Sequence, residues 1–272
     1  MSAQNAARKT LPGTPDDTTA LLAADEPAAF TIERADGAAD FVLVCDHASR
    51  EIPRSLGTLG LSHTELHSHI AWDIGTAAFA RLLSERLDAT LILQNYSRLV
   101  IDCNRPLTAT DSVAIRSEWV DITGNEKLSA TQIDARRDTI FTPYHDAIRM
   151  TLDARQRTQR RTLLVSIHSF TPKYLNVVRP WSIGVMHRHD ARLGGELLTL
   201  LKRDKRMEVG DNQPYAIEDA SDYTLPVHGE ARGIAHVGIE IRQDLIGDDA
   251  GQKTWAGRLA SLLKQAADAM RQ

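Results

Sequence analysis

Three apolar runs in this sequence end in side chains that carry out acid, base or metal chemistry in proteins. FVLVC at 41–45 precedes Asp46 and His47, LLVSI at 163–167 precedes His168, and VGI at 237–239 precedes Glu240. Apolar runs of this length are typical of buried strands, and open α/β sheets bind ligands beyond the carboxyl ends of their strands. If the three strands are neighbours, two imidazoles and a carboxylate converge. That set is the ligand and base inventory of a catalytic zinc site.

A histidine-rich stretch follows the first run. It contains His63, His67 and His69, and Asp73 follows His69 by four residues, so a helix would present the last two on one face. These side chains are further candidate metal ligands. The alternative is structural, because three histidines so close together also suit a solvated helix surface and Asp73 also suits a cap or turn before Gly75.

The segment from Tyr96 to Pro106 concentrates charged and amide side chains around a short apolar core. It holds Arg98, Asp102, Asn104 and Arg105. A guanidinium presents a planar fork that matches a carboxylate, so this composition favours recognition of an anion. The alternative is an internal network of arginine and aspartate that closes a loop.

The elements that must position these residues alternate along the chain. Strands are predicted at 41–45, 90–93, 163–167, 182–186 and 237–241, and helices at 72–87, 131 to about 159, 191 to about 205 and 255–270. This alternation predicts an α/β fold with a mostly parallel sheet covered on both faces. Residues 1–28 lack periodicity and are expected to form a loosely ordered leader before a single domain over 29–272. The polar stretch 210–233 is a candidate lid.

Composition excludes several classes of function. A formal charge of -4 and a pI near 6.2 provide no basic field for nucleic acid. The sequence has no apolar run of about 18 residues and no basic, then apolar, leader, so we expect no membrane association and a cytoplasmic location. Cys45 and Cys103 are expected to be reduced and buried. Homo-oligomerisation stays open.

Five motifs in order resemble the N-formylglutamate amidohydrolase family over about residues 40–250. They are DHASREIP at 46–53, WDIG at 72–75, YSR at 96–98 through Arg105, HSFTP at 168–172 and EIRQDL at 240–245. The resemblance implies the fold of zinc carboxypeptidases, also called phosphorylase/hydrolase-like. That fold is a three-layer α/β/α arrangement around a mixed, mostly parallel sheet. It also implies one zinc ion per chain.

The resemblance to zinc carboxypeptidases implies roles for individual residues. An Asn-Arg pair holds the substrate's carboxylate in those enzymes, and Asn104-Arg105 resembles it. Glu240-Ile241-Arg242 resembles the motif on a late strand that carries their general base.

The metal ligands depart from the peptidase pattern. The peptidases' first two ligands are a histidine and a glutamate three residues later, whereas Glu51 follows His47 by four. We therefore expect His47, Asp73 and His168 to bind the metal, with Glu51 and His69 as alternatives for the second ligand.

The expected function is zinc-dependent hydrolysis of the amide bond of a small N-acyl amino acid, N-formyl forms included, that has a free α-carboxylate. Glu240 is expected to move the proton and Arg98 to stabilise the oxyanion. Asn104 and Arg105 are expected to anchor the carboxylate, and Tyr223 and His228 to close over the substrate.

The substrate and the class of protein stay open. Asp46-His47-Ala48-Ser49 differs from the His-Ser/Ala-Gly form of the branch that deformylates N-formylglutamate, so the acyl group and the amino acid are undetermined. One alternative is a carboxypeptidase or cell-wall peptide amidase. The other is a non-catalytic amino-acid or peptide binding protein.

Overall fold

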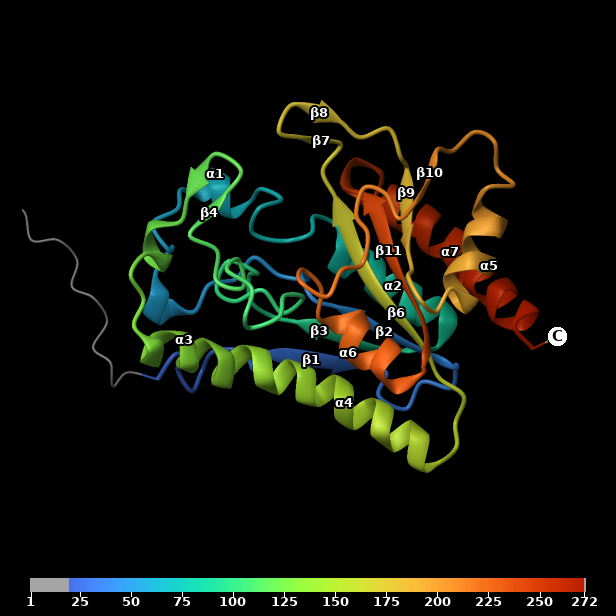
Figure 1. Ribbon diagram of the computed structural model, residues 1–272, viewed down its shortest axis with the longest axis horizontal. Coiled ribbons are helices and arrows are strands. Elements are labelled where there is room, and N and C mark those ends of the chain that lie inside the picture. The colour runs from blue at the N-terminus through green and yellow to red at the C-terminus, as the bar shows by residue number, and fades with distance from the viewer. Residues whose placement is uncertain (1–19, 272) are drawn as a thin grey trace, which may run out of the picture.

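The structure, a computed structural model, describes residues 20–271 and is built around a seven-stranded sheet (Figure 1). In spatial order the strands are β1 (Phe30–Glu33), β3 (Thr90–Gln94), β2 (Phe41–Cys45), β6 (Leu163–Phe170), β11 (Ala235–Arg242), β9 (Ile183–Met186) and β10 (Val209–Asp211). The β1–β3 and β11–β9 pairs are antiparallel and the other four pairs are parallel. The prediction of a mixed, mostly parallel sheet is confirmed.

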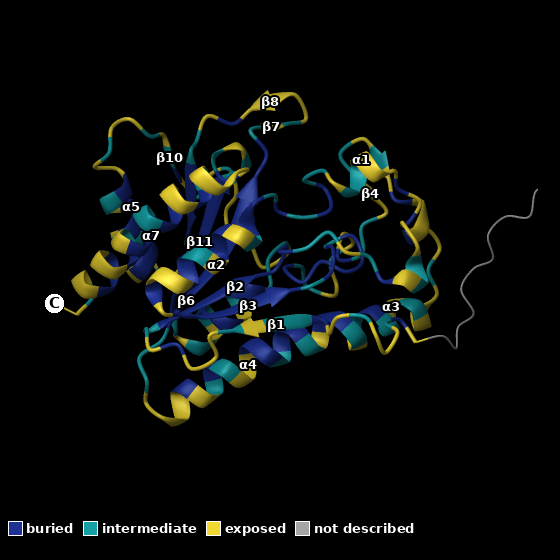
Figure 2. Cartoon of the chain, turned by 180° about the vertical axis from the view of Figure 1, so that it is seen from behind, coloured by how far each residue is buried: buried dark blue, intermediate teal, exposed yellow. Residues whose placement is uncertain are grey.

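Helices cover both faces of the sheet. On one face lie α2 (Thr76–Leu87), α5 (Arg192–Leu201) and α7 (Asp249–Ala269), and on the other α3 (Ala130–Arg136), α4 (Thr142–Arg157) and α6 (Thr224–His228). Figure 2 shows the strands buried between these layers and the outer sides of the helices exposed. This is the predicted three-layer α/β/α arrangement. The short α1 (His63–Leu66) and the hairpins β4–β5 (Arg116–Ser117, Val120–Asp121) and β7–β8 (Lys173–Tyr174, Val177–Val178) lie outside it.

The helix predicted from residue 131 to about 159 is interrupted near its middle. α3 and α4 are joined by a π-helical turn over Arg137–Phe141. Pro143 has no N–H to donate, and its ring would collide with the carbonyl one turn earlier in a regular α-helix. Widening the preceding turn accommodates the proline without breaking the rod.

Successive side chains along each strand point to opposite faces of the sheet, and each face has its own hydrophobic core. Leu43 of β2 and Ile239 of β11 pack against the α2, α5 and α7 layer, whereas Val44 and Leu164 pack toward α4. His168 follows Leu164 by four residues along β6, and Glu240 follows Ile239 by one along β11. Both side chains therefore emerge on the α4 and α6 face, at the carboxyl end of the sheet.

The amino-terminal segment is partly outside the described residues. Of the predicted leader over 1–28, residues 1–19 lie outside them. The remainder packs against the domain: Leu21 is buried, and the Tyr96 hydroxyl donates to the Pro27 carbonyl at 2.7 Å. Cys45 and Cys103 are both buried and unpaired. No helix among residues 20–271 is long and apolar enough to cross a membrane.

Candidate metal and catalytic site

His47, Asp73 and His168 meet at the carboxyl end of the sheet. One ligand atom from each lies within 4.8 Å of the other two, and all three residues are buried. His47 comes two residues after the end of β2, and His168 lies near the end of β6, the parallel neighbour of β2. The two strands therefore bring the rings to 5.0 Å, centre to centre.

Asp73 reaches the histidines from the turn that precedes α2. Its backbone N–H donates to the His47 carbonyl at 3.0 Å. Gly75 has a φ of 81°, and a Cβ there would lie 2.1 Å from the Ile246 carbonyl oxygen, so the turn requires glycine. The turn places Asp73 Oδ2 2.9 Å from His168 Nδ1 and 3.4 Å from His47 Nδ1.

The other two candidates for the second ligand lie apart from this cluster. Glu51 is exposed, and the His69 ring pairs with Glu118 at 3.1 Å. The prediction that His69 and Asp73 share one face of a helix is wrong, because α1 ends at Leu66 and the chain from there to Gly75 forms turns.

In each histidine, the ring nitrogen that points away from Asp73, Nε2, makes a contact that orients the ring. His47 Nε2 donates to Asp102 Oδ1 at 2.7 Å. His168 Nε2 lies 2.9 Å from Ser166 Oγ and 3.4 Å from Asp46 Oδ2, and Ser166 Oγ donates to the same Asp46 oxygen at 3.3 Å. Both Nδ1 atoms consequently face Asp73. Outer contacts of this kind fix the tautomer of metal-binding histidines.

Ion pairing outweighs burial for the charged members of the cluster. Burial opposes ionisation of Asp73, but His47 and His168 hold the pKa of its carboxyl well below its usual range. Burial likewise opposes ionisation of Asp102, and Arg98 holds its pKa well below the usual range. Burial disfavours the charged form of His168, yet its carboxylate partners raise the pKa of the ring well above its usual range. The cluster is held together by charge.

Glu240 lies beside His168, its register partner on the parallel strand β6. Burial raises the pKa of the Glu240 carboxyl to about 7; the positive His168 opposes this shift and the negative Asp73 adds to it. A carboxyl that titrates near neutral pH can accept and then return a proton, which is the property required of a general base and acid. Glu240 Oε2 is buried and has no hydrogen-bond partner.

The donor set fits a divalent transition metal. His47 Nδ1 is buried with no hydrogen-bond partner although it faces Asp73, and a buried polar atom left unpaired is costly unless a ligand occupies it. Two imidazole nitrogens and one carboxylate oxygen, with the outer nitrogens already bonded, form the donor set that zinc prefers in catalytic sites. His47, Asp73 and His168 are therefore the residues able to hold such an ion.

The predicted anion-binding residues surround the cluster but already have protein partners. Arg98 Nη2 donates to Asp102 Oδ2 at 2.6 Å, and Nη1 lies 3.7 Å from Asp73. Asn104 Oδ1 accepts the backbone N–H of Thr224 at 3.1 Å. Arg105 donates to Asp111 at 3.0 Å and also to the Ser221 carbonyl. These contacts form the internal network that was the alternative for this segment, and recognition of an anion by it stays a prediction.

These side chains open onto a cavity of about 350 Å³. It is lined by His47, Asp73, Arg98, Asp102, Asn104, Arg105, His168 and Glu240, together with His69, Glu118, Phe170, Tyr174 and Tyr215. Pockets for small molecules range from about 300 to 1,000 Å³, so the cavity suits a compact ligand.

The structure does not bring Tyr223 and His228 to this cavity. The Tyr223 ring packs at 4.5 Å from that of His145, and His228 Nε2 lies 3.0 Å from His145 Nδ1. These contacts form where α6 packs against α4. The two residues belong to the layer behind the site.

Sequence reasoning did not identify the residues that support His168. Asp46 accepts hydrogen bonds from the Tyr144 hydroxyl and from Thr224 Oγ1, both at 2.8 Å, in addition to the Ser166 contact. Asp46 is adjacent to His47 in sequence but serves the other histidine. The available signal was general: a metal-binding histidine needs a carboxylate or carbonyl on its second nitrogen.

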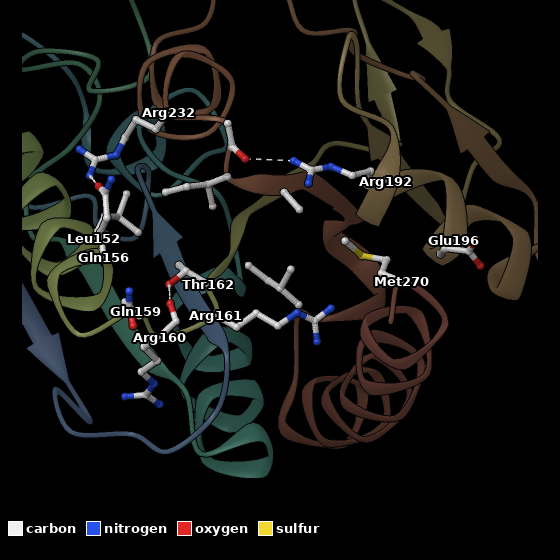
Figure 3. A pocket seen from close by; sticks show the side chains of 14 residues that line it. Leu152, Gln156, Gln159, Arg160, Arg161, Thr162, Arg192, Glu196, Arg232 and Met270 are labelled. Atoms are coloured by element: carbon white, nitrogen blue, oxygen red, sulfur yellow. Dashed lines mark hydrogen bonds between the residues drawn. The ribbon is translucent and has the colours of Figure 1, made fainter. Parts of the chain in front are cut away.

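A larger cavity of about 720 Å³ lies away from this chemistry, by the amino-terminal ends of β6 and β11 (Figure 3). Glu196 is its only acidic lining residue, and it has no histidine. Its arginines already have partners: Arg161 pairs with Asp40 at 3.2 Å, and Arg192 donates to the Gly233 carbonyl at 3.0 Å. The smaller cavity is therefore the candidate active site.

Comparisons with known proteins agree with the motifs. The sequence matches the family model described as N-formylglutamate amidohydrolase over residues 39–247, which confirms the resemblance. The gene product Atu2144 from Agrobacterium tumefaciens is similar at 40% identity and a TM-score of 0.90, over 93% of this chain and 100% of that one. An N-formylglutamate amidohydrolase from Ralstonia eutropha JMP134 shares the fold at 20% identity and a TM-score of 0.65, over 90% of this chain and 99% of that one. No curated protein matches the sequence.

Proposed function

We propose that this chain, which belongs to the N-formylglutamate amidohydrolase family, is a zinc-dependent hydrolase of small N-acyl amino acids with a free α-carboxylate. One observation carries the proposal. Two histidines whose outer nitrogens are bonded turn their Nδ1 atoms toward Asp73, and Glu240, with an unpaired oxygen, lies beside them. A site for hydrolysis needs both the metal ligands and this base.

The residues divide the chemistry between them. His47, Asp73 and His168 would hold zinc, which when bound polarises an amide carbonyl and acidifies water. Glu240 accepts a proton as the water oxygen bonds to the carbonyl carbon. The same carboxyl then gives that proton to the amide nitrogen as the C–N bond breaks, releasing a carboxylic acid and a free amino acid. Arg98 lies near enough to Asp73 to offer positive charge to the developing oxyanion.

Substrate anchoring rests on Asn104 and Arg105, which line the same cavity. Arg105 donates to Asp111, whose side chain is 57% exposed, so a substrate carboxylate can compete for the guanidinium from the solvent side. This arrangement favours substrates with a free α-carboxylate. We also propose that residues 29–272 act as one catalytic domain. The cytoplasmic location stays a prediction, and the oligomeric state stays open.

The test combines metal analysis with a panel of N-formyl and N-acetyl amino acids. The proposed enzyme contains about one zinc per chain and hydrolyses members of the panel, and a chelator abolishes the activity. Glu240→Gln should retain zinc while kcat falls by about 10²-fold or more, because the amide cannot accept the proton. His168→Ala should lose zinc and activity together.

Glu118→Gln is the matched control for Glu240→Gln, because Glu118 lines the same cavity but pairs with His69 rather than facing the metal ligands. Its activity should stay within a few-fold of wild type. A chain that binds acyl amino acids but contains no zinc and cleaves none of them would instead be the binding protein considered as the alternative. Loss of zinc from Glu240→Gln would make that residue a ligand.

A further inference from the structure

A groove between β1 and α4 lies apart from the candidate active site. The two elements run side by side in Figure 1 and in Figure 2, and the cavity between them has a volume of about 550 Å³, within the range of small-molecule sites. Its apolar lining residues are Phe30, Ile32, Ala35, Ala147, Met150 and Ala154. Ile32 is 39% exposed and Met150 is 62% exposed, so the described residues leave this apolar surface uncovered.

Two arginines line the groove near the carboxyl-terminal end of α4. Arg155 is 5% exposed, and Arg160 is half-buried. Arg155 Nη2 donates to the Ala39 carbonyl at 2.6 Å, and Arg160 Nη2 donates to the same oxygen at 2.7 Å. The two guanidinium groups are therefore close neighbours that share one neutral acceptor.

Neither guanidinium has an acidic partner among residues 20–271. Arg155 Nε also donates to Thr162 Oγ1 at 3.2 Å. Arg160 Nη2 also donates to the Gly37 carbonyl. No ion pair within the described residues includes either arginine. Carbonyl and hydroxyl oxygens carry no net charge, so both positive charges stay unbalanced, whereas buried charges in proteins are usually paired.

Nearby carboxylates do not supply the missing negative charge. Asp40 favours the charged form of Arg155, but it already pairs with two other arginines, Arg161 at 3.2 Å and Arg271 at 3.0 Å. Asp36 lines the groove, but it is exposed and forms no ion pair within the described residues. Burial, with repulsion from the neighbouring guanidinium, lowers the pKa of Arg155 to about 10, which leaves it charged at neutral pH. An anion in the groove would relieve this repulsion.

We propose that this groove binds a small amphipathic anion, with its apolar body along α4 and its phosphate or carboxylate head at Arg155 and Arg160. Guanidinium forks match the oxygens of both kinds of head. From Ala147 to Arg155 the helix rises about 12 Å, enough for a chain of moderate length. Because two positive charges are unbalanced, a phosphate ester, which carries nearly two negative charges at neutral pH, suits the groove better than a carboxylate. The inference does not depend on the proposed hydrolysis.

The experiment is isothermal titration calorimetry of the full chain with octyl phosphate, octanoate and octanol, which share a chain and differ in the head. We expect octyl phosphate to bind about 10-fold more tightly than octanoate and about 100-fold or more tightly than octanol, since hydrogen bonds to charged groups are the strong ones. The advantage of the charged heads should shrink as salt is raised. Octanoate that binds as tightly as octyl phosphate would identify a carboxylate as the head. Octanol that binds as tightly as both would overturn the proposal.

Variants assign the binding to this groove. Arg160→Gln should weaken octyl phosphate by about 10- to 100-fold and leave octanol nearly unchanged, whereas Arg160→Lys, which keeps the charge, should retain part of the affinity. Met150→Gln, at an exposed position, should weaken all three ligands because it removes apolar contact. Arg157→Gln is the matched control, since Arg157 is an exposed arginine at the same helix end that does not line the groove. It should leave all three affinities unchanged.

Three outcomes would overturn the proposal. Octyl phosphate binding that survives both Arg160→Gln and Met150→Gln would place the ligand elsewhere, for example at the candidate metal site. A lower free energy of unfolding in Arg160→Gln with unchanged affinity would limit Arg160 to fastening the Gly37 and Ala39 carbonyls. No binding of octyl phosphate to the full chain would leave the groove to another segment or another copy of the chain.

Discussion

Replacing Asp102 with asparagine tests whether this carboxylate prepares His47 for the proposed metal. The carboxylate is 3% exposed and accepts from His47 Nε2 at 2.7 Å, Arg98 Nη2 at 2.6 Å and the backbone N–H of Asn104 at 2.9 Å. Asparagine keeps the shape, but its amide nitrogen can donate to Nε2. The imidazole proton then moves to Nδ1, the atom that faces Asp73 and would hold the ion.

The expected cost is a loss in zinc affinity of about 10- to 100-fold, or roughly 1.4–2.7 kcal/mol, the usual effect of removing such an outer partner. Competition with a chelator of known affinity measures it. Asp111→Asn is the matched control, because it makes the same change at an aspartate whose side chain is 57% exposed and pairs with Arg105 instead. Unchanged zinc affinity in a folded Asp102→Asn protein would refute the tautomer argument.

Three further outcomes follow from the site and the layer behind it. Arg105→Lys keeps the charge but loses the fork, so kcat/KM for substrates with a free α-carboxylate should fall by about one to two decades; an equal loss for the α-amide analogue contradicts the anchor role. Burial lowers the pKa of His145 to about 4 and that of His228 to about 3, against an ordinary value of 6.5. Below pH 6.5 the unfolded chain takes up protons that the buried rings cannot accept, so the free energy of unfolding is highest above pH 6.5 and falls as the pH approaches 4. For His145 alone the decrease is about 3 kcal/mol. Chemical denaturation at several pH values should show a shallower loss in His228→Gln than in wild type, and identical slopes would contradict the assignment. Zinc uptake at pH 7 should release roughly one to two protons from His47 and His168, measured by calorimetry in two buffers of different ionisation enthalpy; heat that does not depend on the buffer would count against it.

The local sequence was sufficient to predict the elements that form the centre of the sheet. The run at 41–45 is β2 at the predicted bounds, because five buried apolar residues end at the charged Asp46. Strands β1 and β10 are short and lie at the two edges of the sheet. The residues of β1 are partly exposed and β10 contains a glycine, so neither strand has a clear apolar run in the sequence. The helix predicted from Trp72 begins at Thr76 instead, since Gly75 at a φ of 81° cannot continue a helix backward.

The candidate site was partly predictable because its histidines and Glu240 lie at strand ends, whereas the residues that support it are brought together by contacts between distant parts of the chain. His47, His168 and Glu240 each follow or end an apolar run, and the register of β6 and β11 sets the last two opposite each other. Two of the donors to Asp46, Tyr144 and Thr224, lie 98 and 178 residues away along the chain, on two different helices. Tyr223 was predicted to close over the candidate site, but it does not line the cavity, and only the packing of α6 on α4 shows where its ring lies.

The charges of the cluster suit a buried site that would hold a divalent ion. Asp46 and Asp73 are ionised despite burial, since the adjacent histidines bring the pKa of Asp46 to about 2 and that of Asp73 below its usual range. Burial opposes the charge on His47 and His168, but their carboxylate partners raise the pKa of both rings.

Protons on the two Nδ1 atoms are therefore favoured at the positions where an ion would place its positive charge. Replacement of two such protons by one divalent ion would leave the net buried charge unchanged. Asp102 and Arg98, which pair with each other at 2.6 Å, are balanced in either state. Glu240, with a pKa of about 7, remains the member of the cluster free to change its charge, which is the property that the proposed proton transfer requires.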